Sequence, residues 1–196
     1  MYQSHKDDPD TPLTDTLGEY AKLIEAGKVR AIGASNYTAV RLSEALIASE
    51  RHNLPRYESI QPEYNLYSRE PFEGTCRRWS RRRTWAPSTT TRWPAAFSAA
   101  NTAARPTSAR ARGKKIVDTY LNDRGYRILK ALDEVAEDAN CTPAQAALAW
   151  QIAQPGITSP IVSATSLAQL DELVKAASLT LTRDQLARLS LASDWR

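Results

Sequence analysis

Residues 28–37 read Lys-Val-Arg-Ala-Ile-Gly-Ala-Ser-Asn-Tyr, and this stretch decides the fold. The largely apolar run from Val29 to Ala34 predicts a short buried strand, and two polar residues, Ser35 and Asn36, follow it directly before a predicted helix. The carboxyl ends of buried parallel strands are where α/β barrels carry their reactive groups. The stretch therefore predicts a parallel α/β sheet and the edge of that sheet at which function would lie.

The rest of the chain repeats this alternation of strand and helix. Further short strands are predicted near Tyr2, at residues 58–62 and at residues 157–162. Apolar residues spaced three and four apart predict helices between them. One helix is expected to start at Thr11-Pro12, and two others are expected around Leu42 and Leu132. Three more are expected to start at Thr142, Ser166 and Thr182, each of which has a glutamine three residues later, as in a capping box. Strands separated by helices imply right-handed βαβ units and a parallel sheet.

The composition suits one globular domain and excludes several function classes. The chain has 196 residues, of which 42% are apolar. It has two cysteines, Cys76 and Cys141, and two histidines, His5 and His52, too few for a disulfide framework or a metal site. No apolar run approaches the roughly 20 residues that cross a bilayer, and no signal-peptide pattern is present. We therefore expect a cytoplasmic protein with no membrane partner.

Residues 75–110 differ from the sequence on either side of them. This segment holds eight arginines and lacks Leu, Ile, Val, Asp and Glu. The whole chain carries 26 basic and 22 acidic residues, a net charge of +4, so everything outside the segment sums to −4. The basic character thus belongs to one segment. With no aliphatic side chain larger than alanine, the segment is expected to be poorly ordered and to form no barrel strand.

A shifted reading frame explains this composition. If the third base of each codon is read with the first two bases of the next, Trp85-Ala86 is forced to Gly and Trp93-Pro94 to Ala. Thr84-Trp85 then gives Leu, Met or Val. A compatible reading of the segment is Leu-Gly-Ala-Val-Asn-Tyr-Tyr-Ser-Leu-Ala-Ser-Gly-Phe-Leu-Ser-Gly-Lys-Tyr. We interpret residues 75–110 as out of frame, with the frame restored before Ala111.

Four stretches of the chain resemble the aldo-keto reductases in order and in spacing. They are Tyr2-Gln3-Ser4-His5-Lys6-Asp7-Asp8, residues 27–36, Gln61-Pro62-Glu63-Tyr64-Asn65-Leu66, and residues 160–166. The resemblance covers about residues 1–74 and 111–196. It implies one incomplete barrel domain over 1–196, a partial TIM (β/α)₈ barrel of about strands 4–8 with a disrupted strand 7. It also implies NADPH-dependent reduction of an aldehyde or ketone, so that the partner is a small carbonyl substrate.

The resemblance also assigns site residues. His5 resembles the catalytic histidine that hydrogen-bonds the substrate carbonyl oxygen. Ser35, Asn36 and Gln61 resemble the residues that hold the nicotinamide carboxamide. The adenosine-phosphate side of the cofactor is assigned Ser163, Gln169 and Glu172, at a loop and helix start whose free N–H groups favour anions. Many relatives have basic residues where Ser163 and Gln169 stand, which bears on the preference for NADPH.

Each assignment has a structural alternative. A histidine near a terminus is usually just exposed, Asn36 could only cap a helix, and Gln61 could be a polar strand end. The family's proton-donating tyrosine and its lysine and aspartate precede strand four, so this chain is expected to be inactive as given. Two other function classes remain open. One is a non-catalytic cofactor-binding or interaction protein; the other, a nucleic-acid-binding module built on the Arg- and Trp-rich segment, is disfavoured because shifted GC-rich DNA yields the same composition.

Overall fold

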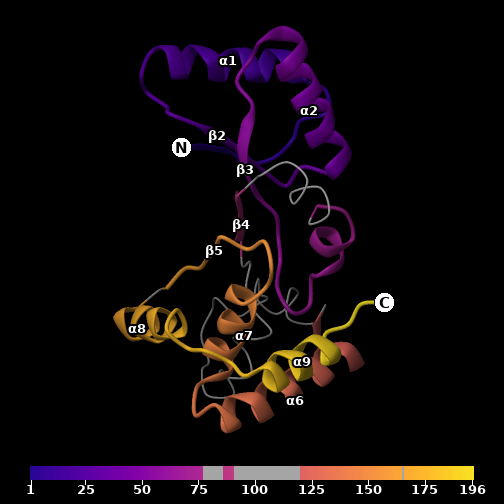
Figure 1. Cartoon of the computed structure of the whole chain (residues 1–196), viewed down its shortest axis with the longest axis vertical. Helices are drawn as coiled ribbons and strands as arrows, with labels where there is room; N and C mark the ends of the chain where they lie inside the picture. Colours follow the sequence, from indigo (N-terminus) through magenta and orange to yellow (C-terminus); the bar gives the residue numbers. More distant parts are fainter. Residues whose placement is uncertain (77–85, 91–119, 165) are drawn as a thin grey trace, which may run out of the picture. The chain divides into compact units, whose positions relative to one another are not determined.

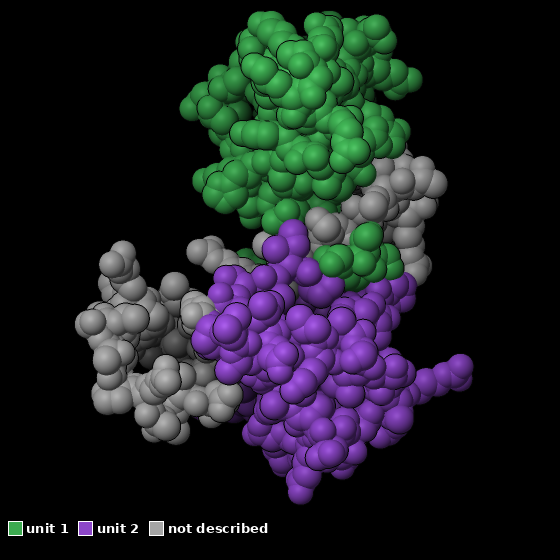
Figure 2. Space-filling model, turned by 90° about the vertical axis from the view of Figure 1, so that its left-hand side faces the viewer, with its two compact units in different colours: residues 1–63, 71–90, 156–159 green, residues 64–70, 91–155, 160–196 purple. Residues whose placement is uncertain are grey.

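The computed structural model describes residues 1–76, 86–90, 120–164 and 166–196. The chain divides into two compact units, coloured separately in Figure 2. Unit 1 comprises Met1–Glu63, Pro71–Thr90 and Gly156–Ser159. Unit 2 comprises Tyr64–Glu70, Thr91–Pro155 and Pro160–Arg196. Both units are therefore built from separate stretches of sequence.

Unit 1 is organised around parallel strands. The first three are β1 (Tyr2–Ser4), β2 (Ile32–Ser35) and β3 (Tyr57–Gln61). β1 pairs with β2 in the register Gln3↔Gly33, and β2 pairs with β3 in the registers Gly33↔Ser59 and Ser35↔Gln61. All three strands are parallel, as the βα alternation predicts. Their carboxyl ends consequently lie at one edge of the sheet.

Two helices connect these three strands. They are α1 (Leu13–Glu25) and α2 (Ala39–His52), which pack against each other (Figure 1). A short π-helix, η1, spans Pro71–Cys76. The core of the unit is apolar and almost fully inaccessible to solvent, at Leu17, Ile32, Leu42, Ala45, Tyr57 and Ile60. These include the residues whose helical spacing and strand position predicted burial.

A fourth strand corrects the expectation for the Arg-rich segment. β4 (Ala86–Thr90) pairs in parallel with β3 in the register Ser59↔Ala86, and the sheet order is β1-β2-β3-β4-β5, with β5 at Ser159–Ile161. The expectation that no strand forms within 75–110 is therefore wrong for these five residues. Their sequence, Ala-Pro-Ser-Thr-Thr, ends in β-branched threonines that favour strands even without larger aliphatic groups. Most of the remaining segment lies outside the described residues.

Unit 2 consists mainly of helices. They are α6 (Asp123–Asp138), α7 (Pro143–Ile152), α8 (Leu167–Ala176) and α9 (Arg183–Ala192). α6 packs against α7 and α9, and α7 packs against α8 (Figure 1). The side chains between them are fully or almost fully buried, at Ile128, Leu132, Val135, Leu148, Trp150 and Leu189. Within the described residues, no helix has both the length and the apolar character needed to cross a membrane.

Local hydrogen bonds define where most elements begin. Thr142 with Gln145, and Thr182 with Gln185, form two of the three predicted capping boxes, and at the third the Ser166 hydroxyl accepts from the Gln169 N–H. The predicted cap at Thr11 is wrong, because Pro12 is the N-cap residue of α1 and no side chain caps the helix. The Thr11 hydroxyl donates to Asp8 Oδ2. β2 begins at Ile32 rather than at Val29, whose N–H bonds back to the Leu23 carbonyl at the end of α1.

Candidate cofactor and carbonyl site

Polar residues follow three neighbouring strands of unit 1 at the point where each strand ends. His5 comes directly after β1, Asn36 directly after β2, and Gln61 is the last residue of β3. The register pairs Ser35 with Gln61, so these ends lie side by side. The structure therefore brings together four of the predicted site residues, namely His5, Ser35, Asn36 and Gln61.

Asn36 links the end of β2 to the end of β1. Its backbone has φ of 57°, a left-handed conformation that asparagine adopts more readily than most residues. Its Nδ2 group donates to the His5 carbonyl oxygen at 2.7 Å and to Ser35 Oγ at 3.1 Å. An amide nitrogen has two hydrogens, so both bonds can form together. Asn36 thus fixes the backbone beside the histidine.

Ser35 continues this connection to β3. The side chain is almost fully buried, with 4% of its surface exposed, and its hydroxyl donates to the Gln61 carbonyl oxygen at 2.8 Å. A serine hydroxyl has one hydrogen to donate and can also accept, and here it accepts from Asn36 while donating to Gln61. One chain of side-chain hydrogen bonds therefore joins the ends of β1, β2 and β3.

His5 presents its side chain to solvent. The residue is exposed, and its imidazole has no hydrogen-bond partner among the described residues, whereas its backbone carbonyl is held by Asn36. An imidazole N–H at the edge of the sheet can donate to an incoming oxygen atom. The geometry is compatible with the role of a carbonyl-binding group that resemblance assigns to His5.

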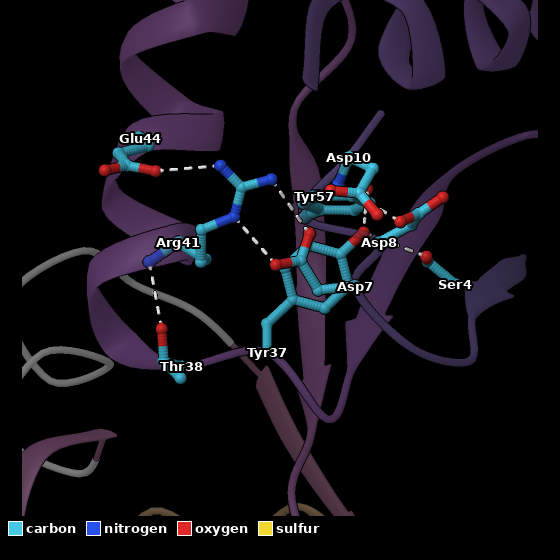
Figure 3. Close-up of polar contacts among 9 residues, drawn as sticks. All are labelled: Ser4, Asp7, Asp8, Asp10, Tyr37, Thr38, Arg41, Glu44 and Tyr57. Atoms are coloured by element: carbon cyan, nitrogen blue, oxygen red, sulfur yellow. Dashed lines mark hydrogen bonds and ion pairs between the residues drawn. The ribbon is translucent and has the colours of Figure 1, made fainter. Parts of the chain in front are cut away.

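Next to these residues lies a polar network that the sequence did not predict (Figure 3). Ser4 Oγ lies 3.1 Å from the Tyr37 hydroxyl, which lies 3.1 Å from the Tyr57 hydroxyl. Burial, reinforced by the contact with Tyr37, raises the pKa of Tyr57 well above its ordinary value. The Arg41 guanidinium binds the Asp7 carboxylate with two hydrogen bonds. The residues that these contacts join are 20 to 34 positions apart in the chain, so no local sequence pattern could have predicted the contacts.

The other predicted cofactor residues belong to unit 2. Ser163 is exposed just after β5, and Gln169 lies in the first turn of α8. Glu172 is half-buried against α7, where its Oε1 accepts from the Thr142 hydroxyl at 2.6 Å. The Gln145 side chain also donates to the Glu172 carbonyl oxygen at 3.1 Å. These three residues thus belong to a different unit from His5, Ser35, Asn36 and Gln61.

No group of three or more His, Cys, Asp or Glu residues that could hold a metal ion occurs among the described residues. The polar groups at the strand ends are amides, hydroxyls and one imidazole. Such groups suit the recognition of an amide or a carbonyl oxygen by hydrogen bonds.

Comparison with known proteins identifies a family for this chain. The family model described as "Aldo/keto reductase family" matches residues 1–193. The chain is 30% identical over 183 residues to Protein tas of Escherichia coli (strain K12), covering 92% of this chain and 53% of that protein. It is 27% identical over 183 residues to a probable voltage-gated potassium channel subunit beta of Arabidopsis thaliana, covering 89% of this chain and 55% of that protein.

A solved structure matches the fold. The crystal structure of a thermostable aldo-keto reductase in complex with the inhibitor epalrestat superposes with a TM-score of 0.72 at 23% identity, covering 97% of this chain and 58% of that one. The chain thus matches part of an aldo-keto reductase barrel along nearly its whole length. It spans about half the length of the two relatives named above. On the match over residues 1–193, this chain belongs to the aldo/keto reductase family.

Proposed function

We propose that this chain is part of an NADPH-dependent reductase of aldehydes or ketones. The observation that carries the proposal is the hydrogen-bonded chain from the His5 carbonyl through Asn36 and Ser35 to Gln61. It places the group proposed to bind the substrate beside the groups proposed to bind the cofactor. In this family role, the chain contributes one face of a site for a small carbonyl substrate.

His5 acts on the substrate in this proposal. Its exposed imidazole donates a hydrogen bond to the carbonyl oxygen, which polarises the C=O bond and stabilises negative charge as it develops on oxygen. Bound NADPH supplies the hydride. The proton for the oxygen comes from a tyrosine assigned by resemblance, and none of the motifs quoted above contains that tyrosine. Residues 1–196 alone are therefore proposed to bind without turnover.

Asn36, Ser35 and Gln61 hold the nicotinamide carboxamide. Asn36 uses its Nδ2 group inside the protein, which leaves its Oδ1 as an acceptor for the carboxamide NH₂. The donor and acceptor set at the strand ends fits an amide, which itself offers one carbonyl oxygen and one NH₂. In unit 2, Ser163 lies in the loop before α8 and Gln169 in the first turn of that helix, whose N-terminal end favours a phosphate, and Glu172 is proposed to contact the adenosine side.

A fluorescence titration of the 196-residue chain with NADPH tests this proposal. Asn36→Gly keeps the left-handed conformation accessible while removing the amide. Asn53→Gly is the matched control, because Asn53 also has a left-handed backbone, with φ of 51°, but caps α2 at its far end. We expect Asn36→Gly to weaken binding and Asn53→Gly to leave it unchanged. Equal binding by both variants would contradict the proposal.

A non-catalytic binding protein is the second candidate. It is favoured by the 27% identity to a protein whose name describes a channel subunit rather than an enzyme. On the chain alone, absorbance assays with NADPH and small aldehydes have the same expected result for both functions. Binding without oxidation of NADPH fits either the proposed partial reductase or a binding protein. Joining the chain to a segment that carries the family's proton-donating tyrosine, lysine and aspartate is the separating experiment. Turnover should then appear only if the chain derives from a reductase.

A further inference from the structure

The end of β1 and the loop after it are connected to residues 36–41, which lead into α2, by three contacts, and Figure 3 shows those of Ser4 and Asp7. Ser4 Oγ lies 3.1 Å from the Tyr37 hydroxyl, and the His5 carbonyl accepts from Asn36. Beyond His5, the Asp7 carboxylate accepts from Arg41. The first two contacts hold the backbone before and at His5. Of the three contacts, only that of Asp7 holds the backbone after His5.

The Asp7–Arg41 pair has the geometry of a strong ion pair. Arg41 Nε donates to Asp7 Oδ2 at 2.7 Å and Arg41 Nη2 donates to Asp7 Oδ1 at 3.1 Å, so both carboxylate oxygens are bound by the planar guanidinium. The side chains are 26% and 15% exposed. Partial burial with bidentate geometry distinguishes this pair from the ordinary surface ion pair, which contributes little.

A second contact of the same arginine shows that the guanidinium is itself fixed. Arg41 Nη1 donates to Glu44 Oε2 at 3.0 Å, one turn further along α2. The Thr38 hydroxyl caps this helix by accepting from the Arg41 N–H. The guanidinium is therefore anchored to the first turn of a capped helix and holds Asp7 from a rigid element rather than from another loop.

The position of Asp7 gives the pair a role beyond stability. Asp7 lies two residues after His5, whose imidazole has no hydrogen-bond partner among the described residues. The backbone on both sides of His5 sets the direction of its Cα–Cβ bond, and so the part of the sheet edge that the imidazole can reach. We propose that the Asp7–Arg41 ion pair is a positioning device that fixes the His5 imidazole at the sheet edge and keeps the His5 carbonyl within reach of Asn36.

The pair also links the two sides of the candidate site, an inference that rests on the proposed function. Asn36 precedes α2 and binds the His5 carbonyl, while Arg41, on α2, holds Asp7. The residue proposed to bind the cofactor and the residue proposed to bind the carbonyl are thus held by the same two segments. Loss of the ion pair releases the loop on which both depend.

The two histidines of the chain allow a direct test. The Cε1–H region of a proton–carbon correlation spectrum of the imidazole rings contains one signal from His5 and one from His52. His52 is the last residue of α2, the helix that carries Arg41, so its signal reports whether that helix remains folded. The variants are Arg41→Gln and Asp7→Asn, separately and together. The controls are Glu44→Gln, which removes the other carboxylate bound to Arg41, and Arg56→Gln.

Arg56→Gln is a matched control because Arg56 also binds one carboxylate with two nitrogen atoms. Its partner is Glu58, two residues away, with both Arg56–Glu58 distances 3.1 Å. This contact ties no distant loop. We expect Arg41→Gln and Asp7→Asn to shift the His5 signal, and the double variant to shift it no further, because both changes remove one interaction. The His52 signal, Glu44→Gln and Arg56→Gln should show no comparable shift.

Other outcomes would overturn the inference. An unmoved His5 signal in Asp7→Asn does so, and this variant lies outside α2 and so remains informative if Arg41→Gln unfolds the helix. A shift of equal size in Arg56→Gln, or additive shifts in the double variant, would do so as well. Arg41→Lys keeps the charge but loses the planar guanidinium that binds both carboxylate oxygens. Its His5 signal should therefore lie between those of the unsubstituted chain and Arg41→Gln. NADPH titration of the unsubstituted chain is a separate readout: no binding there would defeat the proposed function and leave the His5 result standing.

Discussion

The side chains of Gln3 and Ser59 meet across Gly33, with 3.3 Å between Ser59 Oγ and Gln3 Oε1. The three residues are in register on β1, β2 and β3, and Gly33 is on the central strand. A Cβ atom at Gly33 would collide with both polar atoms. The contact therefore exists because the middle strand has no side chain at this position.

Replacing Gly33 with alanine is expected to destabilise the chain. The added methyl group must displace the Gln3 and Ser59 side chains, an overpacking change that typically costs about 1–3 kcal/mol. Gly18→Ala is the opposite control, since Gly18 lies inside α1 and, its own helix backbone and chain neighbours aside, no atom of the described residues lies within 4 Å of the added Cβ. This change should stabilise the chain by roughly 0.5–1 kcal/mol. Urea unfolding measures both. Stabilisation by Gly33→Ala would show that the contact is not needed.

The two capping boxes should respond differently to the same substitution. Thr142 and Thr182 each cap a helix with glutamine three residues on, but the Thr142 hydroxyl also donates to Glu172 of α8. Thr182→Ala should cost the usual cap energy of about 1 kcal/mol. Thr142→Ala should cost a further amount on the order of 1 kcal/mol, because it also removes the bond to a charged carboxylate. Equal losses in urea unfolding would mean that the Glu172 bond contributes nothing.

Stability should fall as the pH rises above the ordinary pKa of tyrosine. Burial and the contact with Tyr37 raise the pKa of Tyr57 in the folded chain, and burial also raises that of Tyr20. Above about pH 10, unfolded tyrosines lose their protons while these two retain theirs, so the unfolded state binds fewer protons and the free energy of unfolding decreases. Tyr57→Phe should flatten this slope without removing it, because Tyr20 remains. An unchanged slope would refute the assignment.

The coding DNA provides a fourth test. We expect one base gained or lost near the codons for Gly74–Cys76 and a compensating change near Ser108–Ala111. Correcting both should give a stretch rich in Leu, Gly and Tyr and remove most of the eight arginines, which would turn the net charge from +4 toward negative. A stop codon in the alternative frame between residues 75 and 110 would rule this out.

The position of β4 bears on the same question. In the compatible reading, Leu-Gly-Ala-Val-Asn-Tyr arises from residues 84 to 90, and it resembles the family's seventh strand. β4 occupies Ala86–Thr90, next to β3 and parallel to it. A strand therefore forms where the shifted reading predicts one, although residues 75–110 as written were expected to form none.

Local signals predicted most of the fold because their partners are close in sequence. The capping boxes at Thr142 and Thr182 need only residues three positions apart, and the apolar spacing along α6 directly reflects its buried face at Ile128 and Leu132. Ser35 and Asn36 could be placed at a strand end for the same reason. Their mutual contacts with His5 and Gln61 follow once the strands are known to be parallel.

Long-range polar contacts could not be predicted in this way. Nothing in the local sequence around Arg41 indicates that its partner is Asp7, 34 positions earlier. Burial of charged and hydroxyl groups depends on which elements meet, so this part of the site is visible only in the folded chain.

The segment 64–70 has a consequence for how the chain is made. Arg69 is almost fully buried; its Nη1 donates to the Ser190 carbonyl at 2.7 Å and to Ser193 Oγ at 2.8 Å, and its guanidinium lies over the Trp150 ring. These hydrogen-bond partners are 121 and 124 positions later in the chain. During synthesis on the ribosome, Arg69 emerges long before its partners exist. The Arg69 contacts can therefore form only after translation has reached Ser193, near the end of the chain. The β1–β2 and β2–β3 pairings, in contrast, join residues that are all made within the first 61.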